Sequence, residues 1–381
     1  MFLPQNMKRI YFDNAATTQL EPEVLKAMMP FFTEKFGNPS SIYSYGRETK
    51  MAIENARKSV AKILNAHPAE IFFTSGGTES TNTAINAAVF DLQCKHIISS
   101  PLEHHATLHS IEHLSKEANI RLSYVKVSST GQIDYDDLEN LLKESNEKCL
   151  VSLMHANNEI GTMTDIDRVG NLCKNYNAIF NADTVQTVGH FPIDLRSLPV
   201  HFINAAGHKF HGPKGVGILY INENIKIHPF INGGSQERGM RAGTENIYGI
   251  IGFAKALELA IENLEADSRH IKEVRDYMKE SLIKNIPGIY FNGDDEAESL
   301  YTVLSVAFPK TEKSEMLLFN LDIHNICASG GSACTSGVEA GSHVIRAITH
   351  NPNQVTVRFS FSKYNTKDEV DIVIEKLKEM I

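Results

Sequence analysis

The 381-residue sequence has few cysteines, no long apolar run and no large excess of one charge. Its five cysteines are irregularly spaced and form neither a disulfide framework nor the ligand pattern of a metal site. No window is long and apolar enough to span a bilayer, and the N-terminus lacks the apolar core of a signal peptide. We therefore expect a cytoplasmic protein that has no membrane contact and binds no metal.

Charge and length limit the classes of protein further. The net charge of −9 comes from 46 acidic and 37 basic residues that are interspersed along the chain. This argues against direct binding of nucleic acid, although a local basic patch is compatible with it. The length suits a large domain and a smaller one, and we expect an α/β large domain over residues 15–255 with a small domain from residues 1–14 and 256–381.

A lysine in a glycine-rich turn is the first candidate for chemistry. Lys209 lies in segment 206–215, between two apolar runs, 201–205 and 216–221, that are typical of strands. A lysine held at a strand end can lose its proton and attack a carbonyl, which suits a Schiff base with pyridoxal 5′-phosphate (PLP). The alternative is a surface lysine that at most contacts an anion, which is the commoner case near glycines.

A carboxylate upstream of this lysine supports the same cofactor. Asp183 follows the apolar residues 178–180, at the end of another expected strand. A carboxylate beside the pyridine nitrogen would keep the PLP ring protonated and able to withdraw electrons. Without Lys209, a helix N-cap would be an equally good interpretation of Asp183.

Residues 75–82 offer a place for the phosphate. They follow the expected strand 71–74 and open a helix, so Gly77 and Thr78 can present backbone N–H groups and a hydroxyl to an anion. A glycine turn before a helix is common, and by itself it is a weak signal.

Two further strand ends carry polar side chains. His104 follows the expected strand 96–100, where an imidazole could stack on a planar cofactor and move protons, or could be an ordinary loop residue. Segment 155–161 follows the expected strand 150–154, and an asparagine amide there could bond the phenolic oxygen of PLP. Strand ends of an open parallel sheet converge on one crevice, so we expect these side chains to meet.

Other segments have helical or strand patterns. We expect short strands at 289–291, 302–308 and 356–360 to form a smaller sheet, which the N-terminal residues should join. Helices are expected over residues 23–32, 47–65, about 250–284 as one long helix, and 367–380.

The five cysteines differ in their surroundings. Cys334 is flanked by glycines and small polar residues, which predict an exposed, mobile loop where a thiolate could act as a nucleophile. From these residues alone, a catalytic and a non-catalytic role are equally supported. Cys327 lies in an apolar context and is expected to be a buried structural thiol, while Cys94, Cys149 and Cys173 are expected to be packing residues.

These motifs in this order resemble the cysteine desulfurases of the NifS/IscS group, which are fold-type I, class V aminotransferase-like PLP enzymes. The resemblance covers essentially the whole chain. It implies a large domain with a mainly parallel sheet of the seven-stranded type, and an α+β small domain that carries the cysteine loop. The matching segments are residues 11–18, 36–41, 74–80, 154–161, 207–209, 238–244 and 329–336.

The resemblance implies roles around the cofactor ring. Lys209 would form the Schiff base with PLP, and Asp183 would pair with the pyridine nitrogen. His104 would stack on the ring and help to move protons. Asn158 and Gln186 would bond the ring oxygen.

The resemblance also implies a phosphate site. Thr78, in the turn with Gly77, would hold the phosphate together with His208. Thr244 would reach the phosphate of the neighbouring subunit, so a homodimer is expected. One residue departs from the pattern: Ala206 stands where related sequences usually have serine, which removes one hydroxyl contact to the phosphate.

For the substrate, the resemblance implies an arginine clamp and a cysteine nucleophile. Arg358 would hold the carboxylate of L-cysteine through its planar guanidinium, assisted by Asn38. Cys334 would attack the substrate sulfur, leaving alanine and a persulfide on Cys334. The sulfur would then pass to an acceptor protein, which could be an iron–sulfur scaffold, a tRNA-thiolation protein or a nitrogenase-dedicated scaffold.

Two other classes stay open at this point. Another PLP enzyme, such as an aminotransferase or a selenocysteine lyase, would keep its activity after Cys334→Ala. A noncatalytic scaffold would show no visible absorbance from a bound cofactor, and the presence of Lys209, Asp183 and His104 together disfavours it.

Overall fold

A seven-stranded sheet forms the centre of the larger part of the molecule, in a computed structural model that describes residues 9–294, 299–330, 341–349, 351 and 353–381. The strand order is β2-β8-β7-β6-β5-β3-β4, and all neighbours are parallel except β8, which runs antiparallel to β2 and β7. The expected mainly parallel sheet is confirmed. Its strands are β2 Ile71–Thr74, β3 His96–Ser99, β4 Arg121–Tyr124, β5 Cys149–Met154, β6 Ile179–Asp183, β7 Phe202–Ala206 and β8 Gly217–Ile221.

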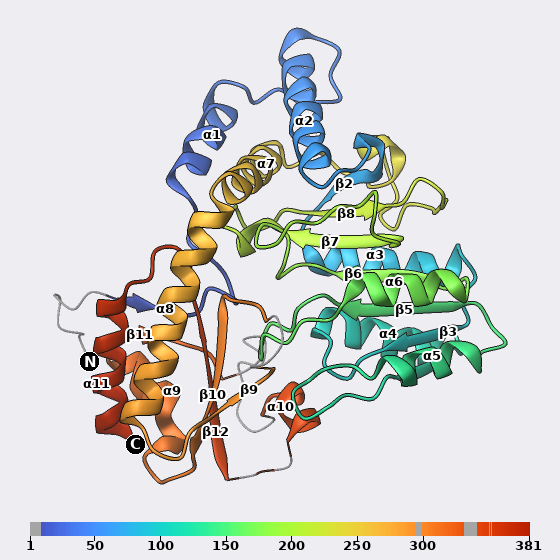
Figure 1. Cartoon of the computed structure of the whole chain (residues 1–381). Helices are drawn as coiled ribbons and strands as arrows, with labels where there is room; N and C mark the ends of the chain where they lie inside the picture. The colour runs from blue at the N-terminus through green and yellow to red at the C-terminus, as the bar shows by residue number, and fades with distance from the viewer. Residues whose placement is uncertain (1–8, 295–298, 331–340, 350, 352) are drawn as a thin grey trace.

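Helices cover both faces of this sheet (Figure 1). Successive residues of a strand point to opposite faces, so Phe180 and Ile203 pack in one buried cluster, whereas Ile179 and Phe202 pack in another. Burial on both faces explains why these strands are almost continuous apolar runs. The first cluster includes side chains from α1 Pro22–Thr33, α2 Ser44–Ile63, α5 Tyr135–Lys143, α6 Ile166–Asn175 and α7 Ile247–Glu262, and the second from α3 Gly77–Phe90 and α4 His105–Glu117.

Local sequence signals account for several helix starts. α1 begins at Pro22, where the missing N–H costs nothing because the first turn has no intrahelical acceptor. Asp134 and Asp165 accept backbone N–H groups at the starts of α5 and α6. Thr366 and Glu369 form a capping box at the start of α11.

A smaller unit of sheet and helices lies beside the large sheet (Figure 1). Its three antiparallel strands have the order β12-β10-β9, and they share a separate buried cluster with α8, α9 and α11. The division of the chain into domains at residues 15 and 255 stays a prediction. The elements are α8 Leu264–Asn285, β9 Tyr290–Asn292, β10 Val303–Pro309, α9 Leu317–Ile323, β12 Gln354–Ser360 and α11 Lys367–Met380. A further helix, α10 His343–Ile348, packs instead with Leu102 and Ile160 in another buried cluster.

The N-terminal residues were expected to join the smaller sheet, but those that the structure describes do not form one of its strands. β1 Ile10–Tyr11 pairs in parallel with β11 Ile326–Cys327, and together they form a separate two-stranded sheet. A single β-bridge between Asp13 and Ser360 then connects the N-terminal segment to β12. Residues 11–18 are thereby carried toward the large sheet.

The expected long helix over residues 250–284 is two helices. Asn263 separates α7 from α8, with φ −104° and ψ 5°. Its backbone N–H and its side-chain amide both bond the Leu259 carbonyl, at 3.1 and 2.8 Å. An asparagine side chain competes for backbone groups in this way, which apolar periodicity alone does not reveal.

Three of the cysteine expectations agree with the structure and one does not. Cys94, Cys149 and Cys173 are buried. Cys327, the last residue of β11, is only partly buried. The expectation of a buried Cys327 is therefore wrong, and Cys334 lies outside the described residues.

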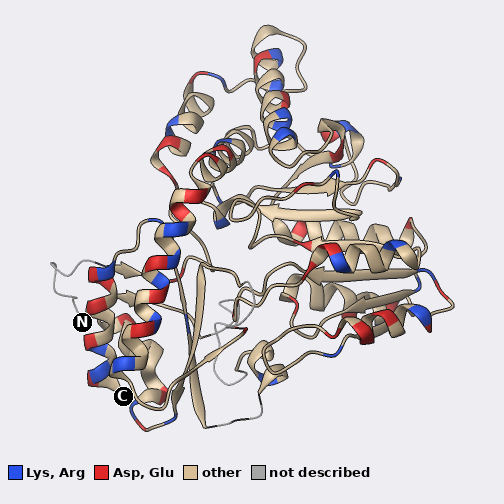
Figure 2. Ribbon diagram, viewed as in Figure 1, with Lys and Arg blue, Asp and Glu red and all other residues tan. Residues whose placement is uncertain are grey.

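The surface carries both signs of charge. Figure 2 shows basic and acidic residues mixed along the ribbons of α8 and α11, as the interspersed sequence pattern indicates. None of the helices in the described part of the chain is long and apolar enough to cross a membrane.

Candidate active site

A cavity of about 250 Å³ lies at the carboxyl ends of three neighbouring parallel strands. The last residue of each strand lines it: Met154 of β5, Asp183 of β6 and Ala206 of β7. Met154 and Asp183 are direct partners across the two strands. The expected convergence of strand ends on one crevice is therefore present.

Most of the residues proposed from the sequence line this cavity, and three do not. Thr244 lines a separate cavity of about 150 Å³ beside Ser75 and Gly215. Asn38 is exposed in the connection between α1 and α2. Cys334 lies outside the described residues. The cavity-lining residues are Gly77, Thr78, His104, Asn158, Asp183, Gln186, His208, Lys209 and Arg358.

Lys209 enters the cavity from the short 3₁₀ helix Gly207–Lys209 that follows β7. Its Nζ donates to the carbonyls of Ala15 and Ala16, at 2.6 and 3.0 Å. Its own carbonyl is 3.1 Å from Nε2 of His190. Lys209 is thus held at both its backbone and its amine, and the N-terminal segment supplies the contacts to the amine.

Asp183 is buried at the end of β6, where its Oδ1 accepts the Val185 N–H at 3.0 Å. Burial raises the pKa of its carboxyl to about 6, against the opposing effects of that hydrogen bond and of the Lys209 charge. A protonated ring nitrogen would offset the cost of this buried charge.

His104 caps α4 and faces the same cavity. Its Nδ1 accepts the Ala106 N–H at 3.1 Å, so the neutral ring carries its proton on Nε2. Burial, and next the charge of Lys209, lower the pKa of His104 to about 4. The imidazole is therefore uncharged at neutral pH.

The start of α3 forms one end of the cavity. Gly76 has φ 150°, and a Cβ at Gly77 would lie 2.7 Å from Cγ2 of Val185, so the turn requires glycine. Thr78 and His208 line both this cavity and an adjoining one of about 430 Å³ that also reaches Lys214. The unpaired N–H groups of the helix start, with a lysine nearby, suit a phosphate.

These features fit PLP. A buried carboxylate, an amine and an anion-binding helix start lie around one cavity, and His104 offers a flat uncharged ring. Gln186 donates its amide N–H to the Ala15 carbonyl at 3.1 Å, and the same oxygen accepts from the Lys209 amine at 2.6 Å.

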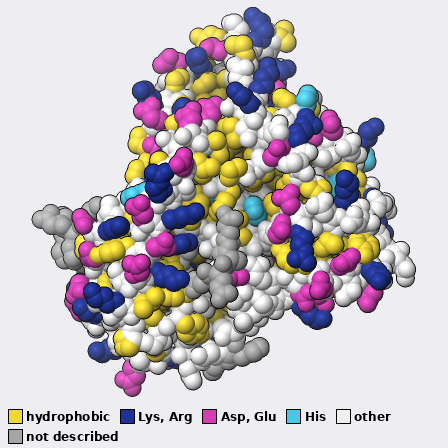
Figure 3. Space-filling model, in the orientation of Figure 1, with side chains coloured by type: hydrophobic (Ala, Val, Ile, Leu, Met, Phe, Trp, Pro, Cys, Tyr) yellow, Lys and Arg dark blue, Asp and Glu magenta, His cyan; other side chains and the backbone are white. Residues whose placement is uncertain are grey.

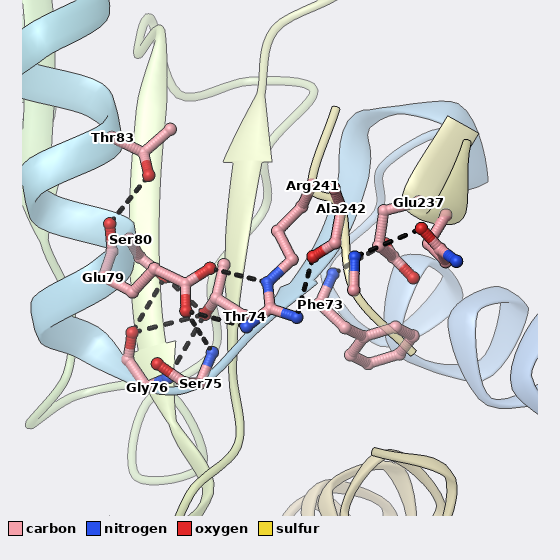
Figure 4. A network of polar contacts seen from close by, with 12 residues as sticks. Phe73, Thr74, Ser75, Gly76, Glu79, Ser80, Thr83, Glu237, Arg241 and Ala242 are labelled. Atoms are coloured by element: carbon pink, nitrogen blue, oxygen red, sulfur yellow. Dashed lines mark hydrogen bonds and ion pairs between the residues drawn. The ribbon is translucent and has the colours of Figure 1, made fainter. Parts of the chain in front are cut away.

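An ion pair joins the start of α3 to the segment that contains Thr244 (Figure 4). Arg241 contacts Glu79 at 3.0 and 3.2 Å, and Glu79 also accepts the Ser75 N–H at 2.9 Å. Because Thr244 is three residues from Arg241, this pair fixes Thr244 close to the turn without bringing it into the cavity.

Arg358 comes from β12 of the smaller unit and is almost completely buried. Its Nη2 lies 2.8 Å from Oδ1 of Asp13, and its Nη1 donates to the Asn158 carbonyl at 2.9 Å. The guanidinium is therefore oriented by residues of both units before any substrate arrives.

The sequence interpretation missed the contribution of the N-terminal segment. Residues 11–18 were matched as a motif only, yet Ala15 and Ala16 receive the Lys209 amine and Thr17 Oγ1 lies 3.2 Å from Nδ1 of His208. The small residues Ala15 and Ala16 soon after a short strand indicate that another part of the chain can come close. They do not indicate that this part is the side chain of Lys209.

It also missed one wall of the cavity, formed by His105, Glu159 and His343. His343 Nε2 lies 3.0 Å from the Glu103 carbonyl, and the Ser342 hydroxyl donates to the Glu159 carboxylate. These contacts join α10 and its N-cap to segments about 200 residues away in the sequence. The sequence near either partner has no pattern that predicts such contacts.

A histidine beside the cavity should make stability depend on pH. Burial lowers the pKa of His155 to about 4, whereas an unfolded histidine titrates near 6.5. The unfolded chain thus takes up a proton that the folded chain refuses, so the stabilising effect is complete above pH ~6.5 and is lost as the pH falls toward 4. Between pH 7.5 and 5.5, wild type should lose about 1 kcal/mol more unfolding free energy than His155→Asn.

Urea unfolding of the cofactor-free proteins at the two pH values measures this difference. The pH dependence of wild type is compared with that of His155→Asn because other buried groups also titrate. Burial raises the pKa of Asp183 and Glu103, and the stability that such acids contribute is lost as the pH rises, opposite to the effect of His155. Equal pH dependence in wild type and His155→Asn would contradict the prediction.

Comparison with known proteins gives consistent similarities. The model of the aminotransferase class-V family matches residues 10–373. The chain is 45% identical to a cysteine desulfurase IscS of Dictyoglomus turgidum, over 98% of this chain and 95% of that one, and 43% identical to one of Methanosarcina thermophila, over 98% and 92%. Among solved structures, a NifS-like protein has a TM-score of 0.90 at 38% identity, over 98% of this chain and 99% of that one. SspA in complex with cysteine has a TM-score of 0.81 at 30% identity, over 94% and 100%.

Proposed function

The chain belongs to the aminotransferase class-V family, and from this premise we propose that it is a PLP-dependent cysteine desulfurase that converts L-cysteine to L-alanine and carries the sulfur as a persulfide on Cys334. The predicted family, fold class, activity and cofactor are confirmed by the matches over nearly the whole chain. The observation that carries the site assignment is that one cavity collects Lys209, Asp183, His104 and Arg358.

The residues of the cavity divide the work of the reaction. When bound, PLP supplies the electron sink that allows bonds at the substrate's Cα and Cβ to be made and broken. Lys209 would hold the cofactor and, once released from it, move the proton at the substrate Cα. Arg358 would receive the substrate carboxylate, and uncharged His104 would present its Nε2–H to the cavity.

The sulfur step needs a nucleophile from the chain itself. The Cys334 thiolate would attack the sulfur of L-cysteine, the Cβ–S bond would break, and Cβ would take a proton to give alanine. Each cycle leaves Cys334 as a persulfide, and no external oxidant is required because the electron pair of the broken C–S bond stays with Cβ, which is reduced as the sulfur is oxidised. Support comes from the two ends of its segment, because Ser329 donates to Asp13 at 2.7 Å and Ser342 donates to Glu159 at the cavity wall.

A homodimer is part of the proposal. Leu25, Met29 and Phe32 form an exposed apolar stripe along one side of α1, and Phe32 stacks on the exposed Tyr248 of α7 at 4.2 Å. Figure 3 shows hydrophobic side chains gathered on this face near the place where Figure 1 draws α7. An apolar surface of this kind favours a second copy, in whose site Thr244 would have its role. Sedimentation as a monomer would contradict the dimer.

The sulfur acceptor is proposed to be a protein of iron–sulfur cluster assembly. The support is the name IscS of several similar chains. The cytoplasmic location stays a prediction.

Product analysis tests the proposed reaction. Purified protein with PLP, L-cysteine and dithiothreitol should release sulfide and alanine in equal amounts, and should release no keto acid. A keto acid in place of alanine would indicate an aminotransferase. Selenide from L-selenocysteine without sulfide from L-cysteine would indicate a selenocysteine lyase.

A further inference from the structure

Asp13 contacts both the arginine of the cavity and the segment that leads toward Cys334. Its Oδ1 accepts from Nη2 of Arg358 at 2.8 Å and from Oγ of Ser329 at 2.7 Å. A single carboxylate oxygen therefore joins two residues with different places in the proposed reaction. Arg358 would bind the substrate carboxylate, and Ser329 lies five residues before the nucleophile Cys334 in the sequence.

The burial of the pair makes Asp13 important for Arg358. The Arg358 side chain is only 2% exposed and that of Asp13 18%, and a buried guanidinium is costly without a close anion. Of its five N–H donors, one bonds Asp13 and one bonds the Asn158 carbonyl, while Nε has no hydrogen-bond partner among the described residues. Asp13 thus sets both the charge balance and the plane of the group that receives the substrate.

Backbone contacts join the same three segments. Arg358 N–H donates to the Ser329 carbonyl at 2.6 Å, and Ser329 N–H donates to the Arg358 carbonyl at 3.2 Å. Asp13 is itself bridged to Ser360, two residues along β12 from Arg358. A shift of the Arg358 backbone is therefore transmitted to Ser329 and to the N-terminal segment.

We propose that Asp13 is a positioning residue that couples the seating of the substrate carboxylate on Arg358 to the position of Ser329. A substrate carboxylate would bind the same guanidinium that pairs with Asp13. Because Asp13 also accepts the Ser329 hydroxyl, a change in the Arg358–Asp13 contact would alter the contact of Ser329 as well. The coupling rests on the proposed function, because it assumes that an amino acid carboxylate is what Arg358 receives.

Three variants separate the two contacts of Asp13. Asp13→Asn keeps the shape but removes the charge, Ser329→Ala removes only the hydroxyl, and the double variant combines them. Asp276→Asn is the matched control, because Asp276 also pairs with an arginine at 2.7 Å but on the exposed surface of α8.

Two readouts distinguish positioning from general structural damage. The affinity for L-alanine, which has the substrate carboxylate but no sulfur, is followed by the visible absorbance of the bound cofactor. The KM for L-cysteine and the kcat of sulfide release are measured on the same proteins. Retained cofactor absorbance in each variant shows that the site is folded.

The expected result is a split between the two single variants. Asp13→Asn should weaken L-alanine binding and raise the KM for L-cysteine by about tenfold or more, the range of a hydrogen bond to a charged group. Ser329→Ala should lower kcat several-fold and leave L-alanine affinity within twofold. The double variant should be no slower in kcat than Asp13→Asn, because both changes act through the one oxygen that joins Ser329 to Arg358.

Wild-type values of KM and L-alanine affinity in Asp13→Asn would overturn the inference, as would additive losses in the double variant. The two proposals can fail separately. If the wild type binds L-alanine but releases no sulfide, the proposed function fails, and the L-alanine titrations of the variants still decide the role of Asp13.

Discussion

Lys209→Ala is expected to abolish sulfide release from L-cysteine, with a loss of at least about 10⁴-fold. The variant loses the amine that would link to the cofactor and the group that would move the Cα proton. Its fold should survive, because the removed amine contacts the backbone carbonyls of Ala15 and Ala16, two residues that line the cavity. Sulfide release and the visible spectrum, recorded together, measure the effect.

An exposed lysine provides the control for that experiment. Lys226→Ala removes a charge from the surface of the same part of the chain and should retain the spectrum and rate of wild type. An added small primary amine should restore part of the activity of Lys209→Ala, since only an amine is missing. A Lys209→Ala protein with the wild-type spectrum and rate would remove Lys209 from the mechanism.

Cys334→Ala is expected to keep the bound cofactor and its visible absorbance, and to lose at least about 100-fold in sulfide release, because removal of a catalytic nucleophile costs that much or more. The substrate would still bind through Arg358, but no thiolate would be present to take its sulfur. Mass spectrometry of wild type after one turnover without reductant should show one added sulfur atom on the peptide that contains Cys334.

A second cysteine of the same region tests whether the effect is specific. Cys327 lies seven residues before Cys334, in β11. Burial raises the pKa of its thiol, so it is a poor nucleophile, and Cys327→Ala is the control. It should release sulfide at the wild-type rate. If instead Cys334→Ala released sulfide equally well, the persulfide step would be wrong and a lyase mechanism would replace it.

The part of the site that was predictable from the sequence lies at strand ends. Asp183 and Lys209 each come within four residues of the end of an apolar run, and parallel neighbours in register end at one edge, so their approach follows from local pattern and sheet topology. Gly77 was found in the same way, because a glycine turn before a helix has a local signature.

The contacts of Arg358 were not predictable in this way. Its partner Asp13 is 345 residues away in sequence and Asn158 is 200 residues away. Whether such residues meet depends on how β12 packs against the N-terminal segment, and periodicity carries no information about that. Similarly, the break at Asn263 depends on one side chain competing for the Leu259 carbonyl within an otherwise helical pattern.

By itself the sequence determined that this protein has a buried, mainly parallel sheet, and which residues stand at the ends of its strands, because apolar runs and turn residues are local properties. Its ordered motifs also indicated the family. Only the tertiary structure decided that the N-terminal segment receives the Lys209 amine, and that Asp13 joins Arg358 to Ser329. The physical reason is that hydrogen bonds and ion pairs act over about 3 Å in space, whatever the distance along the chain.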